Sequence, residues 1–377
     1  MGRRRIWRGI LFFVLAGCVE PFHLSIPVTS INVLVIDGFM NASDSTMEVI
    51  LSRAVSVASS DSAFAEKGAQ VSIEADDGSH VALSEGVQGV YTGKAMSSSA
   101  HKYRLNITTQ DQRKYSSDFI DILETPPIDS VYWIPQPDGV ALFVDSHDPN
   151  NATHYYRWTF DETWKYRVPF LIYKEAINGQ LFDFDPFTSK TICYITGPSS
   201  TAILIYSSAA LRQDAVSKFQ VNFLPMGIKK LSQQYSINVH QRAITANLYN
   251  YWQQIQTRSQ NGGSLFDVLP TQTFSNVHSD TDPEETVLGY FSGSTVTDKR
   301  LFIDTLELPQ YLRHYPANYN CPYDSILLKD FGDLRDTTWF FTSYGVPHPI
   351  GYVTTDKHCM DCTLSGGTIT PPKFWKK

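Results

Sequence analysis

The chain has 377 residues, of which 42% are hydrophobic, 18% charged and 13% aromatic. This apolar content excludes intrinsic disorder, and the length is enough for two or three domains with cores of their own. The formal net charge of -7 excludes a general basic surface, so no nucleic-acid partner is expected.

The N-terminus has the features of an export signal. Four arginines between positions 3 and 8 precede a short apolar run, residues 10–17, which is too short to span a bilayer. The segment Leu15-Ala16-Gly17-Cys18 then resembles the lipobox of bacterial lipoproteins. We therefore expect a signal peptide at 1–17, lipidation of Cys18, and a tether at 18–30 that holds the protein at a membrane. An ordinary signal peptide followed by a chance cysteine is the alternative.

Residues 31–125 are expected to form a first β-sandwich domain. Segments 31–40 and 47–57 bracket a polar loop, and residues 69–75 alternate between apolar and polar side chains before a turn at Asp76-Asp77-Gly78. The strand spacing is typical of an Ig-like or transthyretin-like sandwich. The two prolines of Glu124-Thr125-Pro126-Pro127 favour a domain boundary, because consecutive prolines end a sheet ladder.

Residues 126–358 are expected to form a second β-rich domain, so the fold class is mainly β with two consecutive sandwiches. Segments 128–135 and 140–144 flank Asp138-Gly139, which is typical of a hairpin. Residues 154–160 alternate, and Asp161-Glu162-Thr163 predicts a turn that would expose Trp164.

One prominent helix is predicted at about residues 245–260. Ile244, Leu248, Trp252 and Ile255 form a helical stripe, and Thr245 is a suitable N-cap. The helix is expected to end before residues 261–263 (Asn-Gly-Gly) and to pack on the second domain. Residues 359–377 contain Cys, Gly and Pro and predict an irregular tail.

Four cysteines remain once Cys18 carries lipid: Cys193, Cys321, Cys359 and Cys362. An even number in an exported chain favours two disulfides, and three pairings are open. A bond from Cys193 or Cys321 to the terminal pair would staple the tail to the body. The alternatives are a redox Cys359-x-x-Cys362 pair and a zinc site that includes His358.

Motifs for known catalytic classes are missing from the sequence, including a nucleophile elbow, a His-Glu-x-x-His pair and a P-loop. Asp145, His147 and Asp148 lie close together, but Asp148-Pro149-Asn150-Asn151 is ordinary turn chemistry. Asp183 and Asp185 are interpreted as a solvated loop. We therefore expect no catalytic residue, metal site or cofactor.

Aromatic side chains alternate along several predicted strands, and packing inside the sandwiches is the favoured interpretation. Rings can also stack on sugar faces. The weak candidates for ligand binding are Trp164, Tyr155 and Trp133.

Several segments, in order along the chain, together resemble the Bacteroidetes outer-membrane lipoproteins of the domain-of-unknown-function 4249 family. The segments are the lipobox at Cys18, residues 34–38, 68–71, 155–158, 249–252, 263–266, 287–291 and 359–362, Gly366-Gly367, and Pro372 with Phe374-Trp375. Genes of that family commonly lie beside TonB-dependent receptors, which implies a role in outer-membrane import or surface assembly. The family brings no established catalytic residues.

The resemblance implies a lipid-anchored outer-membrane protein. It does not decide between the cell-surface face and the periplasmic face of that membrane. We expect a non-enzymatic accessory or substrate-capturing partner of a TonB-dependent transporter. A surface module that binds a glycan or peptide is the first alternative. A hydrolase with an unrecognised site is the second.

Overall fold

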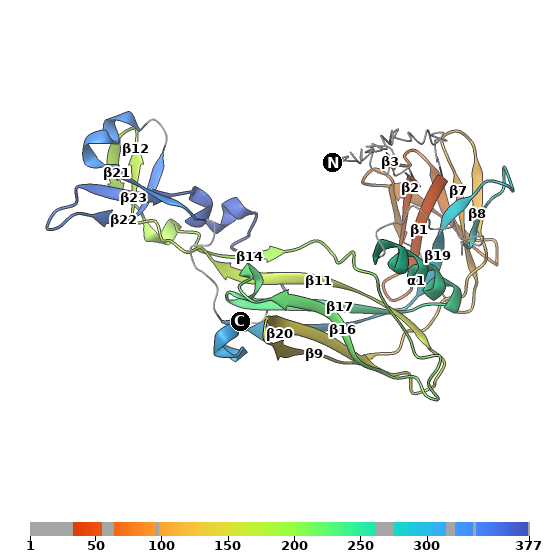
Figure 1. Ribbon diagram of the computed structural model, residues 1–377. Helices are drawn as coiled ribbons and strands as arrows, with labels where there is room; N and C mark the ends of the chain where they lie inside the picture. Colours follow the sequence, from red (N-terminus) through yellow and green to blue (C-terminus); the bar gives the residue numbers. More distant parts are fainter. Residues whose placement is uncertain are drawn as a thin grey trace, which may run out of the picture.

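The computed structural model describes residues 33–54, 64–94, 98–260, 275–313, 321–334 and 337–375. The predicted signal peptide, Cys18, the tether and residues 261–263 lie outside these ranges. Three β-rich modules follow one another across the molecule (Figure 1), with the first module at one end and a small distal module at the other. The expectation of a mainly β fold with consecutive sandwiches and one prominent helix is confirmed.

The first module is one sheet that folds over a single core. Its order is β18-β8-β7-β4-β5-β6-β2-β1-β19, with β3 on β2. Alternating burial along β1 and β7 sends Leu34, Ile36 and Leu105 inward, where they meet Tyr115 and Phe291. The strands are β1 (Val33–Asn41), β2 (Thr46–Ala54), β3 (Phe64–Ala65), β4 (Gln70–Ala75), β5 (His80–Glu85), β6 (Val90–Lys94), β7 (Tyr103–Thr108), β8 (Lys114–Ser117), β18 (Val277–Ser279) and β19 (Val287–Ser294).

The first module is discontinuous in sequence. β19 pairs in parallel with β1, from Leu34 opposite Val287 to Asn41 opposite Ser294, and β18 pairs with β8. The expected segment 31–125 therefore lacks two strands of its own sheet. Local periodicity could predict that these strands exist, but it carries no information about a partner that is distant in the sequence.

The second module is a sandwich of two sheets that share one core. One sheet has the order β16-β10-β9; the other has the order β14-β11-β17-β20, with β15 on β11. Trp158, Tyr156 and Tyr235 are fully buried between them. The strands are β9 (Ile128–Gln136), β10 (Gly139–Ser146), β11 (Tyr155–Arg167), β14 (Ile192–Thr196), β15 (Leu204–Ser207), β16 (Val216–Pro225), β17 (Gln234–Ala243) and β20 (Val296–Asp304).

The expected turn at Asp161-Glu162-Thr163 is wrong, because β11 runs through these positions without a break. Glu162 pairs with Ile237 and Thr163 with Ser236 on the neighbouring β17. The polar side chains are tolerated because the Glu162 carboxylate finds donors inside the sandwich. Trp164 is therefore a half-buried residue in the middle of a strand.

The distal module is a five-stranded sheet with the order β13-β12-β22-β23-β21. Its small core joins Ala176, Phe331, Phe340 and Tyr352. Two of its strands are inserted between β11 and β14 and the others follow β20, so a separate unit lies within the predicted range 126–358. The strands are β12 (Lys174–Ile177), β13 (Gln180–Asp183), β21 (Tyr323–Leu327), β22 (Thr338–Tyr344) and β23 (Gly351–Thr355).

Short 3₁₀ helices connect the strands, and two of them lie in the C-terminal tail. The tail beyond Cys359 is otherwise irregular, with one isolated bridge between Thr368 and Tyr194. The 3₁₀ helices are η1 (Pro186–Thr188), η2 (Lys229–Leu231), η3 (Thr305–Glu307), η4 (Gln310–Leu312), η5 (Leu328–Asp333), η6 (Lys357–Cys359) and η7 (Cys362–Ser365).

The helix α1 (Ala246–Gln260) agrees with the predicted range. Thr245 caps it, since its Oγ1 accepts from the Leu248 backbone N–H at 3.2 Å. Leu248 packs on Ile205 of β15, while Tyr290 of β19 joins the same cluster. The helix thus lies where the first and second modules meet (Figure 1). Among the described residues, no helix has the length and apolar character needed to cross a membrane.

Candidate functional site

A cleft of about 470 Å³ lies beside the linker between the first and second modules. We call it the junction cleft. Its walls are the linker at residues 123–127, the loop at 148–155, and the end of β17 with the start of α1 at 243–245. A smaller cavity of about 200 Å³ shares Leu123 and residues 243–245 with it. Cavities of this size at module junctions are typical of small-molecule or peptide sites.

Hydrogen bonds fix the linker wall of the junction cleft. The Thr125 hydroxyl donates to the carbonyl oxygen of Thr295 at 2.5 Å and accepts from the Ala243 backbone N–H at 2.9 Å. The Gln241 side-chain amide donates to the Pro126 carbonyl at 2.8 Å, and its Oε1 accepts from Trp158 Nε1 at 2.9 Å. The cleft is therefore preformed, because its wall is tied to the core of the second module.

The loop wall of the junction cleft is built around Asp148. Its carboxylate accepts from the backbone N–H groups of Asn150, Ala152 and Thr153 at 2.8–3.0 Å. Burial opposes ionisation, but these donors outweigh it and hold the pKa of Asp148 below its ordinary value. The turn predicted from Asp148-Pro149-Asn150-Asn151 is present. Asp148 is thus a structural acceptor with its oxygens occupied.

The neighbouring acid and histidine do not join Asp148 in one cluster. Asp145 accepts from the Ser130 and Tyr132 hydroxyls at 3.2 Å. His147 Nδ1 lies 2.7 Å from Asp129 Oδ2, and the hydrogen bond to this carboxylate raises the pKa of His147. Each group has its own partner. These residues are therefore close in the sequence but do not form a catalytic or metal-binding cluster.

The Asp183 and Asp185 pair also has structural roles. Asp183 forms an ion pair with Lys174 across the β12–β13 hairpin. Asp185 caps η1 and accepts from the Phe187 backbone N–H at 3.0 Å. Both carboxylates are exposed and serve different local contacts. The solvated-loop interpretation fits Asp185, whereas Asp183 is the last residue of β13.

A chain of serine, acid and histidine lies on the outer face of the second module. Ser199 Oγ donates to Asp161 at 2.5 Å, and His240 bridges Asp161 at 2.9 Å and Asp298 at 2.5 Å. In a hydrolytic triad the serine contacts the histidine. Here the serine contacts the carboxylate instead, so this order does not provide an activated nucleophile.

The three candidate aromatic residues do not form one binding platform. Tyr155 and Trp164 are both on β11, but an odd and an even position face opposite sides of the sheet. Tyr155 packs against Tyr249 of α1 with ring centroids 5.3 Å apart. Trp164 and Trp133 are half-buried against the core of the second module. Tyr155 is the candidate that also lines the junction cleft.

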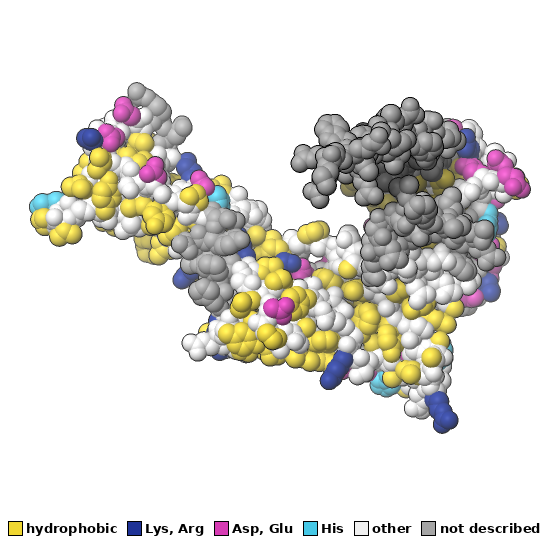
Figure 2. All heavy atoms as spheres, in the orientation of Figure 1, with side chains coloured by type: hydrophobic (Ala, Val, Ile, Leu, Met, Phe, Trp, Pro, Cys, Tyr) yellow, Lys and Arg dark blue, Asp and Glu magenta, His cyan; other side chains and the backbone are white. Residues whose placement is uncertain are grey.

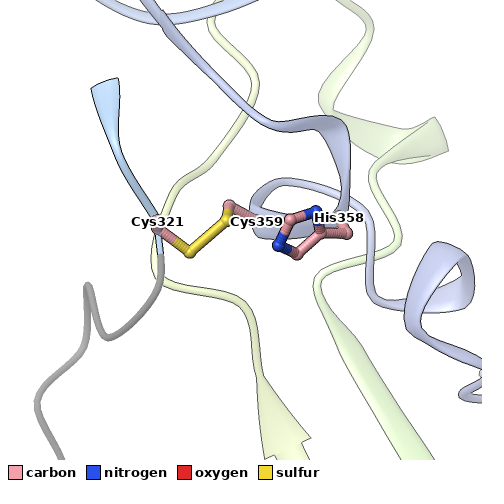
Figure 3. A group of neighbouring side chains, drawn as sticks. All are labelled: Cys321, His358 and Cys359. Carbon is pink, nitrogen blue, oxygen red and sulfur yellow. A yellow bond between two sulfur atoms is a disulfide. The ribbon is translucent and has the colours of Figure 1, made fainter.

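The four cysteines form two disulfides, Cys193–Cys362 and Cys321–Cys359. The expected stapling of the tail to the body is confirmed. The redox alternative is wrong, because Cys359 and Cys362 bond other cysteines and not each other. His358 lies with Cys321 and Cys359 (Figure 3), and their ligand atoms are within 4.8 Å of one another. The bonded sulfurs offer no thiolate, so this group does not fit a zinc site.

The distal module exposes many large apolar side chains. Phe187 is 96% exposed and Val346 is 97% exposed. Figure 2 shows hydrophobic side chains gathered over this end of the molecule. We call this set the apolar distal surface; its residues are Leu171, Tyr173, Ile177, Phe182, Phe187, Tyr323, Leu328, Val346 and Ile350. Apolar side chains concentrated in this way are typical of an interaction surface.

Sequence reasoning missed the polar groups that are buried between strands. Glu162 is 8% exposed and accepts from Tyr235 at 2.5 Å, and Arg157 is stacked 3.8 Å over the Trp252 ring. The alternation of residues 155–167 is the signal that could have located them, because it predicts which positions of this strand face inward. Which charged residues would meet a partner depends on β17 and α1, whose positions the pattern does not give.

The comparisons with curated proteins and solved structures do not give a function. No curated protein matches this chain. A segment of two fibronectin type-III domains from chicken tenascin is 10% identical, with a TM-score of 0.17, and covers 55% of this chain and 90% of that one. A second structure is described as manganese lipoxygenase of Gaeumannomyces graminis and partial zonadhesin of Komagataella pastoris. It is 12% identical, with a TM-score of 0.18, and the match covers 59% of this chain and 91% of that one.

A family model gives the assignment. The model described as a domain of unknown function, DUF4249, matches residues 19–300, which cover the first module and most of the second. The match agrees with the resemblance found in the ordered sequence segments. This chain belongs to the DUF4249 family.

Proposed function

We propose that this protein is a lipid-anchored component of the outer membrane that docks on a TonB-dependent transporter through its distal module. Its role would be that of a non-enzymatic accessory or substrate-capturing partner. The observation that supports docking is the apolar distal surface, where Phe187 and Val346 are almost fully exposed. The sequence Leu15-Ala16-Gly17-Cys18 supports the anchor.

The anchor is tested by Cys18→Ala. The wild-type chain is expected in the outer-membrane fraction, with a lipid-modified Cys18 as its first residue in mass spectrometry. The variant should lose the lipid and the membrane association, because a thiol is needed for acylation. An unmodified N-terminus at another position in the wild type would contradict the anchor.

The docking surface is tested by the double variant Phe187→Ser/Val346→Ser. Both side chains are exposed, so the substitutions leave the core intact. We expect a TonB-dependent barrel to co-purify with the wild-type chain after mild detergent extraction, and to be lost with the double variant. The matched control is Val87→Ser/Leu306→Ser, which changes two side chains that are each 75% exposed on the first and second modules.

The control variant should retain the barrel. A wild-type chain recovered without a TonB-dependent barrel would contradict the partnership. Equal recovery of the barrel with both double variants would contradict the proposed surface while leaving the partnership intact.

The junction cleft supports a second candidate function, the capture of a glycan or peptide. Its volume of about 470 Å³ lies in the range of ligand sites, and Tyr155 lines it. Tyr155→Ala should weaken binding of soluble polysaccharides or peptides in fluorescence titrations, whereas Trp164→Ala, on the other face of β11, should not. Equal weakening by both variants would exclude the cleft as the binding site.

A further inference from the structure

Two arginines face each other on neighbouring strands where the first and second modules meet. Arg157 of β11 and Arg242 of β17 are direct cross-strand partners, and opposed residues project from the same face of a sheet. Arg157 stacks 3.8 Å over the Trp252 ring of α1, and Arg242 stacks 4.1 Å over the Phe39 ring of β1. Like charges opposed in this way destabilise a sheet unless something neutralises them.

The two guanidinium groups lack a close acid. Within the described part of the chain, no carboxylate lies within 4.0 Å of either group. Arg157 Nε is buried and has no hydrogen-bond acceptor, and the same is true of Trp252 Nε1. A buried donor without an acceptor destabilises the folded state, so two such donors together indicate an absent acceptor.

Arg157 and Trp252 line the same cavity, which has a volume of about 10 Å³. Asp37 of β1 and Tyr251 of α1 contribute to its wall. This volume holds about one particle of the size of a water molecule. Burial lowers the pKa of Arg157; burial and the charge of Arg157 lower the pKa of Arg242 to about 10. Both shifts arise first from burial, and the negative charge of Asp37 opposes each of them.

The chemistry of the lining selects the ligand class. The unpaired groups are N–H donors, so the ligand must accept hydrogen bonds, and the adjacent guanidinium groups repel a metal cation. Asp37 is exposed and supplies one negative charge against two positive charges, and the exposed Glu48 acts more weakly on Arg242. The small volume excludes phosphate, sulfate and organic carboxylates.

We propose that this cavity binds a monatomic anion of the halide class, such as chloride, held by Arg157 and Trp252 beside Arg242. The anion neutralises the remaining positive charge and lies between β1 of the first module and β11 and α1 at the second. It therefore helps to fix the two modules against each other. This inference is independent of the docking function.

The first test is chloride binding by the purified full-length chain, followed by the width of the ³⁵Cl NMR line. We expect a saturable excess width that bromide displaces. Arg157→Gln should weaken binding about tenfold, because it removes a charged donor from the cavity wall. Arg242→Gln should weaken binding less, because Arg242 lies opposite Arg157 but does not line the cavity. The matched control is Arg300→Gln on β20, since Arg300 also stacks on a ring, that of Phe374 at 3.7 Å, but lies outside the cavity.

The second test uses the wild-type chain, so it does not depend on the folding of any variant. The thermal unfolding midpoint is measured in sodium chloride and in sodium gluconate at equal ionic strength, because gluconate is too large for the cavity. The midpoint should rise with chloride concentration in a saturable way. Equal midpoints in the two salts, or equal ³⁵Cl broadening in Arg157→Gln and Arg300→Gln, would overturn the proposal; a water molecule would then fill the cavity.

Discussion

Glu162 is a carboxylate buried within the second module, where its surroundings provide several donors. Its Oε1 accepts from Asn222 at 2.7 Å and from the Tyr235 hydroxyl at 2.5 Å, and Lys230 pairs with Oε2. Burial together with the neighbouring carboxylate raises the pKa of Tyr235 well above its ordinary value. The hydroxyl therefore stays protonated and continues to donate to Glu162. The hydrogen bonds of Glu162 thus link the two sheets of the second module.

Glu162→Gln should destabilise the protein by about 2 kcal/mol, because the amide removes the charge that three donors contact. The measurement is the free energy of unfolding in denaturant. Glu284→Gln, at an exposed position in the first module, serves as the control and should change stability by less than about 0.5 kcal/mol. Similar values for the two variants would show that the buried contacts carry no net stability.

Asp148 makes a specific contribution to acid sensitivity. Its pKa is lower in the folded chain than in the unfolded chain, because backbone N–H groups bind the ionised form. This contribution is fully present above the unfolded-state pKa of about 4 and is lost as the pH falls through the lower folded-state value. Asp148→Asn should therefore make the fall in stability below about pH 4 shallower.

The acid prediction is checked by unfolding midpoints measured between about pH 7 and about pH 3. The control is Asp138→Asn at the exposed turn between β9 and β10, which should keep the wild-type slope. A wild-type slope in Asp148→Asn would mean that the turn opens before its carboxylate is protonated.

At the scale of elements, the two disulfides constrain different lengths of chain. Cys193 of β14 and Cys362 of η7 are separated by 169 positions, whereas Cys321 and Cys359 are separated by 38. A longer closed loop removes more entropy from the unfolded chain. The loop-closure relation gives about 5 kcal/mol for the first bond and about 4 kcal/mol for the second.

We expect Cys193→Ser/Cys362→Ser to lower the unfolding free energy more than Cys321→Ser/Cys359→Ser. Each pair leaves two buried serines, so the variants are matched in that respect. The measurement is chemical denaturation of the two double variants and the wild type under non-reducing conditions. The opposite order would indicate that local packing in the tail outweighs the constraint on the unfolded chain.

At the scale of the whole molecule, the parallel pair of β1 and β19 closes the first module with a segment that follows α1. Gly289 of β19 has a φ of +121°, and a Cβ added there would lie 1.8 Å from the Ile36 carbonyl oxygen. Gly289→Ala should separate the two strands and destabilise the protein by more than about 4 kcal/mol.

This closure is checked by the unfolding free energy and by hydrogen exchange along β1. Gly332→Ala in the distal module is the control, because a Cβ there meets nothing within 4 Å. If Gly289→Ala changed the stability little, β19 could shift relative to β1. The close parallel pairing of β1 and β19 would then not be a strict requirement of the fold.

The sequence by itself determined the local elements. Alternation predicted strands such as residues 69–75 and 154–160, and Thr245 with its helical stripe predicted α1, because side-chain period and capping act over a few residues. The even number of cysteines predicted two disulfides. The polar turn at Asp148 followed from Asp, Pro and Asn chemistry, which is equally local.

Only the tertiary structure decided which distant elements meet. It placed β19 beside β1, separated the distal module from the second sandwich, and chose Cys362 as the partner of Cys193. It also turned a predicted turn at Glu162 into the middle of a strand, and it brought Arg157 and Trp252 around one cavity, with Arg242 opposite Arg157 on the next strand. The physical reason is that burial and charge compensation depend on contacts across long sequence separations, whereas periodicity records the preferences of one segment at a time.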